Sequence, residues 1–195
     1  MKKTLYLMRH GQTLFNVQQK IQGWCDSPLT SIGIKQAEVA RLYFNDNNIV
    51  FDKAYCSTSE RASDTLEIVT DNKMEYTRVK GLKEFSFGAY EGKDELLRPK
   101  YPFDDFFVYY GGENQEDMMN RVSKTLHEIM KKENHDVVLA VSHAGSCRSF
   151  LTYNKDNNKV GLDGVINNCC IFKYEYENDI FSCVEIINHD FSNIE

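Results

Sequence analysis

The apolar run Val137-Val138-Leu139-Ala140-Val141 constrains the fold of this chain more than any other segment. A strand with apolar side chains at consecutive positions is buried on both faces, which is typical of a central strand in a parallel sheet. Parallel strands need long crossover connections, and these are usually helices. Segments with helical periodicity do alternate with strand patterns here. We therefore predict an α/β fold, a three-layer α/β/α sandwich with a mostly parallel central sheet and helices on both faces.

Strand and helix patterns can be placed along most of the chain. The expected strands are residues 4–8, 53–56, 74–79, 136–141, 169–175 and 180–187. The expected helices are residues 31–45, a segment after the capping-box sequence Ser57-Thr58-Ser59-Glu60, residues 114–133 and residues 145–153. Residues 80–112 show no clear periodicity. We expect one domain over residues 1–195, with a small cap insertion at about residues 93–112.

The composition argues against several classes of protein. Hydrophobic residues make up 42% of the chain and charged residues 27%, as in ordinary globular proteins. The formal net charge of −6 disfavours sequence-independent nucleic-acid binding, which needs a basic face. No stretch approaches the roughly 20 apolar residues that span a bilayer, and the N-terminus does not resemble a signal peptide. We expect a cytoplasmic protein with reduced cysteines and no nucleic-acid or membrane partner.

The common phosphate and metal motifs do not occur in the sequence. The segment Gly88-Ala89-Tyr90-Glu91-Gly92-Lys93-Asp94 is one residue too short for a P-loop and ends in the wrong residue type. Cys56 stands one residue too close to Arg61 for the loop of a cysteine phosphatase. The sequence contains no G-x-G-x-x-G, no H-E-x-x-H and no ordered calcium loop.

Two histidines follow two of the predicted parallel strands. His10 follows the first strand, and His143 follows the strand that contains residues 137–141. The carboxyl ends of parallel strands are where open α/β sheets bind ligands. Arg9 adds positive charge beside His10, and Arg61 begins a helix whose N-terminus also favours an anion. Either histidine alone would be explained as a structural residue at a strand end. The four residues together predict a site for a phosphate-sized anion.

These residues belong to a series of motifs that resembles the histidine phosphatase superfamily, in its phosphoglycerate-mutase-like branch. The blocks run in the family's order from residue 5 to about residue 150. They are Arg9-His10-Gly11-Gln12-Thr13-x-x-Asn16, Gln22-Gly23-Trp24-Cys25-Asp26-Ser27-Pro28-Leu29-Thr30, Ser57-x-x-x-Arg61-Ala62-x-x-Thr65, Leu82-Lys83-Glu84-Phe85-x-Phe87-Gly88-x-x-Glu91-Gly92, Gly112-Glu113 and Ser142-His143-Ala144-Gly145.

The resemblance implies roles for individual residues. His10 is expected to be the nucleophile that accepts the phosphoryl group, and Glu84 to be the acid and base. The residues expected to bind the phosphoryl group or the rest of the substrate are Arg9, Asn16, Gln22, Gly23, Arg61, His143 and Ala144, of which Arg9, Arg61 and His143 are also expected to be catalytic.

Elementary chemistry supports these roles. Imidazole is a good nucleophile near neutral pH because its ordinary pKa is about 6.5. Guanidinium groups match phosphate oxygens in planar, bidentate pairs, so neither a metal ion nor another cofactor is expected. A carboxylic acid with a raised pKa can protonate the departing oxygen and then, as a carboxylate, activate water.

The leading interpretation is an enzyme, a metal-independent phosphomonoester hydrolase that forms a phosphohistidine on a small phosphorylated metabolite. One alternative is a cofactor-dependent phosphoglycerate mutase, which uses the same intermediate but needs a basic insertion; residues 93–112 offer only Lys93, Arg98 and Lys100. A second is a non-catalytic module that binds a phosphorylated ligand. A third is a metallohydrolase, which the nearby arginines disfavour. The oligomeric state is left open between a monomer and a homodimer.

The aromatic segment 101–110 and the other histidines have less specific interpretations. The segment is expected either to pack as an insertion over the sheet or to cap the site and shape the leaving-group pocket. Its Phe and Tyr residues predict a preference for an apolar or neutral leaving group. His127, His135 and His189 are interpreted as structural or solvent-facing.

Overall fold

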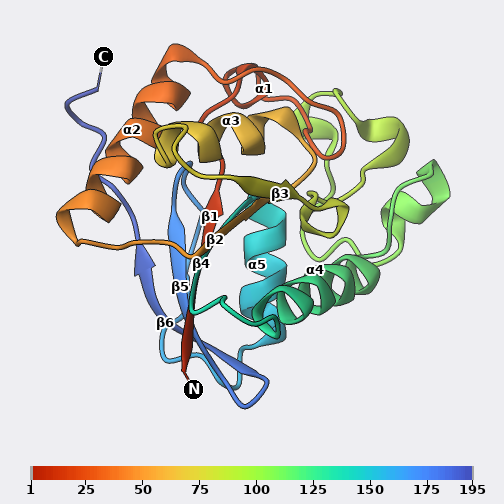
Figure 1. Ribbon diagram of the computed structural model, residues 1–195. Coiled ribbons are helices and arrows are strands. Elements are labelled where there is room, and N and C mark those ends of the chain that lie inside the picture. The colour runs from red at the N-terminus through yellow and green to blue at the C-terminus, as the bar shows by residue number, and fades with distance from the viewer. Residues whose placement is uncertain (1, 195) are drawn as a thin grey trace.

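A computed structural model describes residues 2–194 of the protein (Figure 1). Its strands are β1 (Lys3–Arg9), β2 (Lys53–Cys56), β3 (Tyr76–Arg78), β4 (Val137–Ser142), β5 (Ile171–Glu177) and β6 (Ile180–Ile187). Its α-helices are α1 (Leu14–Val17), α2 (Ser31–Asp46), α3 (Glu60–Val69), α4 (Gln115–Met130) and α5 (Ala144–Tyr153). Between β3 and α4 the chain forms short 3₁₀ turns: η1 (Lys80–Leu82), η2 (Gly88–Tyr90), η3 (Glu95–Leu97) and η4 (Phe106–Tyr110).

The strands form one mixed sheet in the order β3-β2-β4-β1-β5-β6. Strand β4 lies between β2 and β1 and runs parallel to both, whereas β5 is antiparallel to β1 and β6. The predicted fold class is therefore confirmed. In the register of β1 and β4, Arg9 pairs with Ser142. Because each strand is followed directly by a histidine, this register brings His10 and His143 to the same edge of the sheet.

Helices cover both faces of the sheet (Figure 1). Successive side chains of β1 point to opposite faces of the sheet. Leu5 and Leu7 pack with buried residues of α4 and α5 on one face. Tyr6 and Met8 pack with buried residues of α2 and α3 on the other. All four of these β1 side chains are buried. The apolar residues of one strand thus hold helices on both sides. Among residues 2–194, no helix combines the length and the apolar character required to cross a membrane.

The start of α3 differs from its prediction in a way that affects the site. The helix begins at Glu60 with Ser59 as its N-cap, and Ser59 makes no capping bond with its side chain, so the predicted capping box is wrong. The hydroxyl oxygen of Ser57 instead lies 2.7 Å from Nε2 of His143. At the start of α2, by contrast, the N-cap residue does bond the helix, because the Thr30 hydroxyl accepts a hydrogen bond from the Gly33 amide.

The aromatic residues between η1 and α4 form a packed cluster. The ring of Phe107 is fully buried and lies 4.9 Å from that of Phe87 and 5.3 Å from that of Phe103, centroid to centroid, in edge-to-face geometry. Tyr109, by contrast, is 85% exposed. The segment 101–110 therefore packs against the core with one face and exposes the other to solvent.

Candidate active site

His10 lies just beyond β1 and is held in one protonation state by its neighbours. Its Nδ1 is 2.7 Å from the carbonyl oxygen of Gly11, which can only accept, so Nδ1 carries the proton. Its Nε2 accepts a hydrogen bond of 3.2 Å from Nε of Arg61. Burial, followed by the charges of Arg61 and Arg9, lowers the pKa of His10 well below its ordinary value. The imidazole is therefore neutral, with the lone pair on Nε2.

Arg61 is fully buried at the start of α3, and its guanidinium is fixed by the loop that follows α1. Its Nη1 donates to the Asp26 carboxylate at 2.7 Å and to the Cys25 carbonyl at 3.0 Å, and its Nη2 donates to the Gly23 carbonyl at 2.8 Å. The Thr65 hydroxyl connects α3 to the segment after β1, because it accepts a hydrogen bond from the Gly11 amide and donates one to the Arg61 carbonyl. Arg61 and His10 are therefore held as a unit.

The second histidine lies beside the first. The ring centroids of His10 and His143 are 5.2 Å apart, and His143 is fully buried. Burial and then the charge of Arg61 lower the pKa of His143 well below its ordinary value. Nδ1 of His143 and Nε of Arg9 are buried and have no hydrogen-bond partner within residues 2–194. Buried polar atoms of this kind are costly unless something pairs with them, and an anion is a suitable partner.

Glu84 is a buried carboxyl group at the N-terminus of α5. One carboxylate oxygen accepts a bond of 2.8 Å from the Gly145 amide, and the other accepts one of 2.8 Å from the Phe85 amide. Burial raises the pKa of Glu84 above its ordinary value, although these two bonds and the charges of Arg61 and Arg9 oppose the rise. A Glu84 side chain with a raised pKa is suited to hold and release a proton.

A cavity of about 870 Å³ connects these groups to solvent. Of the residues predicted from the sequence, those that line it are Arg9, His10, Asn16, Gln22, Glu84 and Ala144. Arg61, His143 and Gly23 are absent from its wall and lie behind the residues that form it. The predicted residues are therefore brought together, but as two layers around the cavity.

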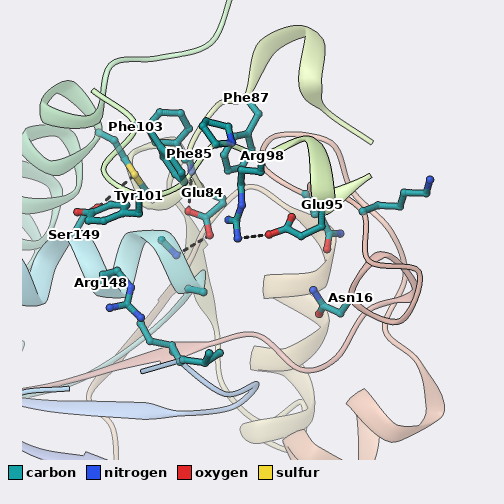
Figure 2. A pocket seen from close by; sticks show the side chains of 18 of the residues that line it. Asn16, Glu84, Phe85, Phe87, Glu95, Arg98, Tyr101, Phe103, Arg148 and Ser149 are labelled. Carbon is teal, nitrogen blue, oxygen red and sulfur yellow. Dashed lines mark hydrogen bonds and ion pairs between the residues drawn. The ribbon is translucent and has the colours of Figure 1, made fainter. Parts of the chain in front are cut away.

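The rest of the cavity wall is both aromatic and cationic. Figure 2 shows Phe85, Phe87 and Phe103 on one side of Glu84 and Arg148 on the other. Arg98 also lines the cavity, forms an ion pair with Glu95 and lies 5.7 Å from the ring centroid of Phe103. Lys100 and Lys20 complete the basic part of the wall. Arg148 of α5 and the basic residues around η3 therefore share the wall with the aromatic rings, and the preference for an apolar or neutral leaving group stays a prediction.

Several residues of the site were not assigned a role from the sequence. The Glu91 carboxylate accepts bonds of 2.8–3.1 Å from the amides of Gly23, Trp24, Cys25 and Phe87, so it shapes the loop that holds Arg61. Asn168 donates to the His10 carbonyl at 3.1 Å and to the Asn16 side chain at 3.3 Å. Glu91 belongs to a motif that the sequence does display, whereas nothing in the sequence marks Asn168.

No metal centre competes with this arrangement in the part of the chain that the structure describes. Within residues 2–194, no group of three or more His, Cys, Asp or Glu side chains is placed to hold a metal ion. His10 instead bonds the Gly11 carbonyl through Nδ1, and the Glu84 carboxylate accepts bonds from two backbone amides.

The sequence matches the description "Histidine phosphatase superfamily (branch 1)" over residues 5–189. It is 32% identical over 167 residues to the 2,3-bisphosphoglycerate-dependent phosphoglycerate mutase of Rhizobium etli (strain CIAT 652), covering 77% of this chain and 79% of that protein. It is 32% identical over 161 residues to a 6-phosphofructo-2-kinase/fructose-2,6-bisphosphatase of Caenorhabditis elegans, covering 77% of this chain but 34% of that protein. This chain thus corresponds to about a third of the longer relative.

The fold is similar to that of solved structures over almost its whole length. The crystal structure of phosphoglycerate mutase from Bacillus anthracis str. Sterne superposes with a TM-score of 0.81 at 26% sequence identity. The superposition covers 94% of this chain and 92% of the other.

Proposed function

The chain belongs to the histidine phosphatase superfamily (branch 1), and from this premise we propose that it is a phosphomonoester hydrolase acting on a small phosphorylated metabolite through a phosphohistidine on His10. The observation that carries the proposal is the neutral His10, whose Nε2 lone pair faces Arg61 while a buried Glu84 lines the same cavity. This pairing supplies a nucleophile, a cation and a proton donor to one phosphate-sized position.

In the first half-reaction, Nε2 of His10 attacks phosphorus. The N–P bond forms as the bond from phosphorus to the leaving oxygen breaks, and Glu84 gives its proton to that oxygen. A phosphoryl oxygen replaces Nε2 as the acceptor of the Arg61 N–H, which frees the lone pair for attack. The Gly11 carbonyl accepts a hydrogen bond from the protonated Nδ1 throughout and so stabilises the positive charge that the imidazole gains.

In the second half-reaction, Glu84 acts as a carboxylate. It takes a proton from water, the water oxygen attacks phosphorus, and the N–P bond breaks to release inorganic phosphate and neutral His10. Glu84 thereby recovers the proton that it gave in the first half-reaction, so no other proton donor or acceptor is needed over one turnover.

The remaining predicted residues are proposed as ligands of the phosphoryl group or of the rest of the substrate. Arg9 and His143 offer buried nitrogens without protein partners, and Arg61 offers its guanidinium. Asn16, Gln22 and Ala144 line the cavity, and Gly23 positions Arg61 through its carbonyl.

We propose that residues 93–112 cap this cavity within one domain. The net charge of −6 disfavours nucleic acid as a partner, and the six free cysteines support a cytoplasmic location.

The pH dependence follows from the directions of two pKa shifts. Attack needs neutral His10, which is lost only as pH falls through its lowered pKa; proton donation needs protonated Glu84, which is lost as pH rises through its raised pKa. We expect kcat/KM for phenyl phosphate to be highest at acidic pH and to decline toward alkaline pH. The same profile measured with Glu84→Gln should lack the decline caused by Glu84. An identical alkaline limb in both proteins would remove Glu84 from this step.

Phosphoglycerate mutase activity is the second candidate, because Arg98, Lys100 and Arg148 line the cavity and could hold a second anionic group. We nevertheless expect net phosphate release from p-nitrophenyl phosphate and other monoesters, with little interconversion of 2- and 3-phosphoglycerate, because Glu95 neutralises Arg98 and aromatic rings fill much of the wall. An enolase-coupled assay with 2,3-bisphosphoglycerate present, run beside phosphate release from an ester panel, measures both. Mutase turnover far above every hydrolysis rate would reverse the ranking.

A further inference from the structure

Glu113 and Arg121 form an ion pair behind the segment that carries Glu84. Glu113 lies just before α4 and Arg121 lies within it, and their side chains are 17% and 22% exposed. Neither residue lines the 870 Å³ cavity, so neither is placed to touch a substrate there. The contacts of the pair are instead with backbone groups on both sides of residue 84.

Arg121 donates to three backbone carbonyl groups of the segment that leads to Glu84. Its Nη1 donates to the carbonyl oxygens of Gly81 and Lys83, each at 2.9 Å, and its Nη2 donates to the carbonyl of Glu84 at 3.2 Å. The remaining donors of the guanidinium bind Glu113, at 2.7 Å from Nη2 and 3.2 Å from Nε. A planar guanidinium with several donors can make this set of bonds, whereas a lysine ammonium cannot reproduce its geometry.

Glu113 holds the other side of the same segment. Its carboxylate accepts a bond of 2.9 Å from the Ser86 amide, and its own amide donates to the Ser86 carbonyl at 3.0 Å. Between these anchors lies the Phe85 amide, which donates to the Glu84 carboxylate. The pair therefore fixes the peptide units before and after Phe85, and with them the amide that orients the carboxyl group.

We propose that Glu113 and Arg121 are positioning residues for proton donation by Glu84. The inference rests on the proposed hydrolase function. Without the pair, hydrogen bonds from Ser142 to the Leu82 carbonyl and from Ser146 to the Lys83 carbonyl still attach the segment to the sheet and α5. Loss of the pair should thus displace Glu84 while leaving the fold and the phosphoryl site of His10 in place.

The expected signature is a loss that depends on the leaving group. Phenyl phosphate releases a phenolate whose conjugate acid has a pKa of about 10, so its departure benefits from a proton. The p-nitrophenolate ion is a much better leaving group and departs without one. For Arg121→Met we expect kcat/KM to fall about 100-fold with phenyl phosphate and less than about fivefold with p-nitrophenyl phosphate, since general acid catalysis contributes on the order of 10²–10⁴-fold.

The experiment compares six proteins with both esters: the unmodified chain, Arg121→Met, Glu113→Gln, Glu84→Gln, Lys124→Met and the double variant Glu84→Gln/Arg121→Met. Lys124 lies on the exposed side of α4 and has only a distant partner in Glu128 at 4.0 Å, so Lys124→Met controls for charge removal from this helix and should match the unmodified chain. Glu113→Gln provides the same test if Arg121→Met does not fold. The double variant Glu84→Gln/Arg121→Met should lose no more than Glu84→Gln alone, because both changes remove one function.

The outcomes separate the inference from the function on which it rests. The positioning role alone would be overturned by the following combination. Glu84→Gln loses more activity with phenyl phosphate than with p-nitrophenyl phosphate, while Arg121→Met and Glu113→Gln lose equal activity with both esters or none. An equal loss for both esters in Glu84→Gln would overturn the acid role of Glu84, and the positioning role with it.

Discussion

Replacing His10 with alanine is expected to reduce turnover of every phosphate ester by at least about 10⁴-fold, the scale on which enzymes lose activity with their nucleophile. The substitution removes the Nε2 lone pair, and no other described side chain has the same relation to Arg61. The protein should remain folded, because the change deletes one ring and two hydrogen bonds from the wall of the cavity rather than from the apolar core.

His135 offers a matched control for this experiment. It is 5% exposed, against 4% for His10, and bonds the Tyr55 hydroxyl and the Glu133 carbonyl, each at 2.7 Å. It precedes β4 and therefore lies at the opposite edge of the sheet. His135→Ala should retain activity. Activity above a few per cent in a folded His10→Ala protein, judged by thermal melting, would contradict the nucleophile assignment.

In Glu84→Gln the phosphoenzyme should accumulate when p-nitrophenyl phosphate is the substrate. Attack by His10 proceeds because this leaving group needs no proton, whereas hydrolysis of the phosphohistidine loses its base and should slow by about 10²–10³-fold. Rapid mixing should show a burst of p-nitrophenolate close to one equivalent of enzyme, followed by slow turnover. Glutamine keeps an oxygen that can accept from the Phe85 or Gly145 amide, so the loop should be preserved.

The chemical identity of the adduct completes this test. A phosphorus–nitrogen bond is labile in acid and stable in base, so mass spectrometry after an alkaline quench should locate the phosphoryl group on His10. Glu95→Gln is the matched control, since Glu95 is another carboxylate of the cavity wall but pairs with Arg98, and it should show no burst. A phosphoryl group found on Cys56 or on a serine would contradict the mechanism.

The sheet edge could be predicted from the sequence because its determinants are local. A strand with apolar side chains on both faces is recognisable in the sequence as a buried parallel strand. The residue that follows it then lies at the edge of the sheet where ligands bind. His10 and His143 are predicted at this edge because each follows a buried strand, and Arg61 is predicted there because it begins a helix. The structure confirms that these residues lie together, with their ring and guanidinium contacts.

The rest of the site depends on contacts between distant parts of the chain. Ser57 was expected to cap α3, but its hydroxyl is engaged with His143, and a tertiary partner outweighed the local pattern. Arg148 reaches the cavity only because α5 starts at the sheet edge and runs along its wall. Asn168 contacts His10 across more than 150 residues of sequence, and no periodicity or spacing signals such a contact.

The carboxylates of Glu91 and Glu113 separate the residues that select the substrate from the residues that react with it. Glu91 and Glu113 anchor backbone amides on either side of residues 93–112, and the reacting groups follow β1 and β4, begin α3 or lie just before Glu91. The intervening residues outside the packed rings of Phe103 and Phe107 can therefore vary in length and side-chain chemistry without moving those groups. A chain built in this way can acquire a different substrate by exchanging one contiguous stretch of its gene, while the machinery for phosphoryl transfer is inherited unchanged.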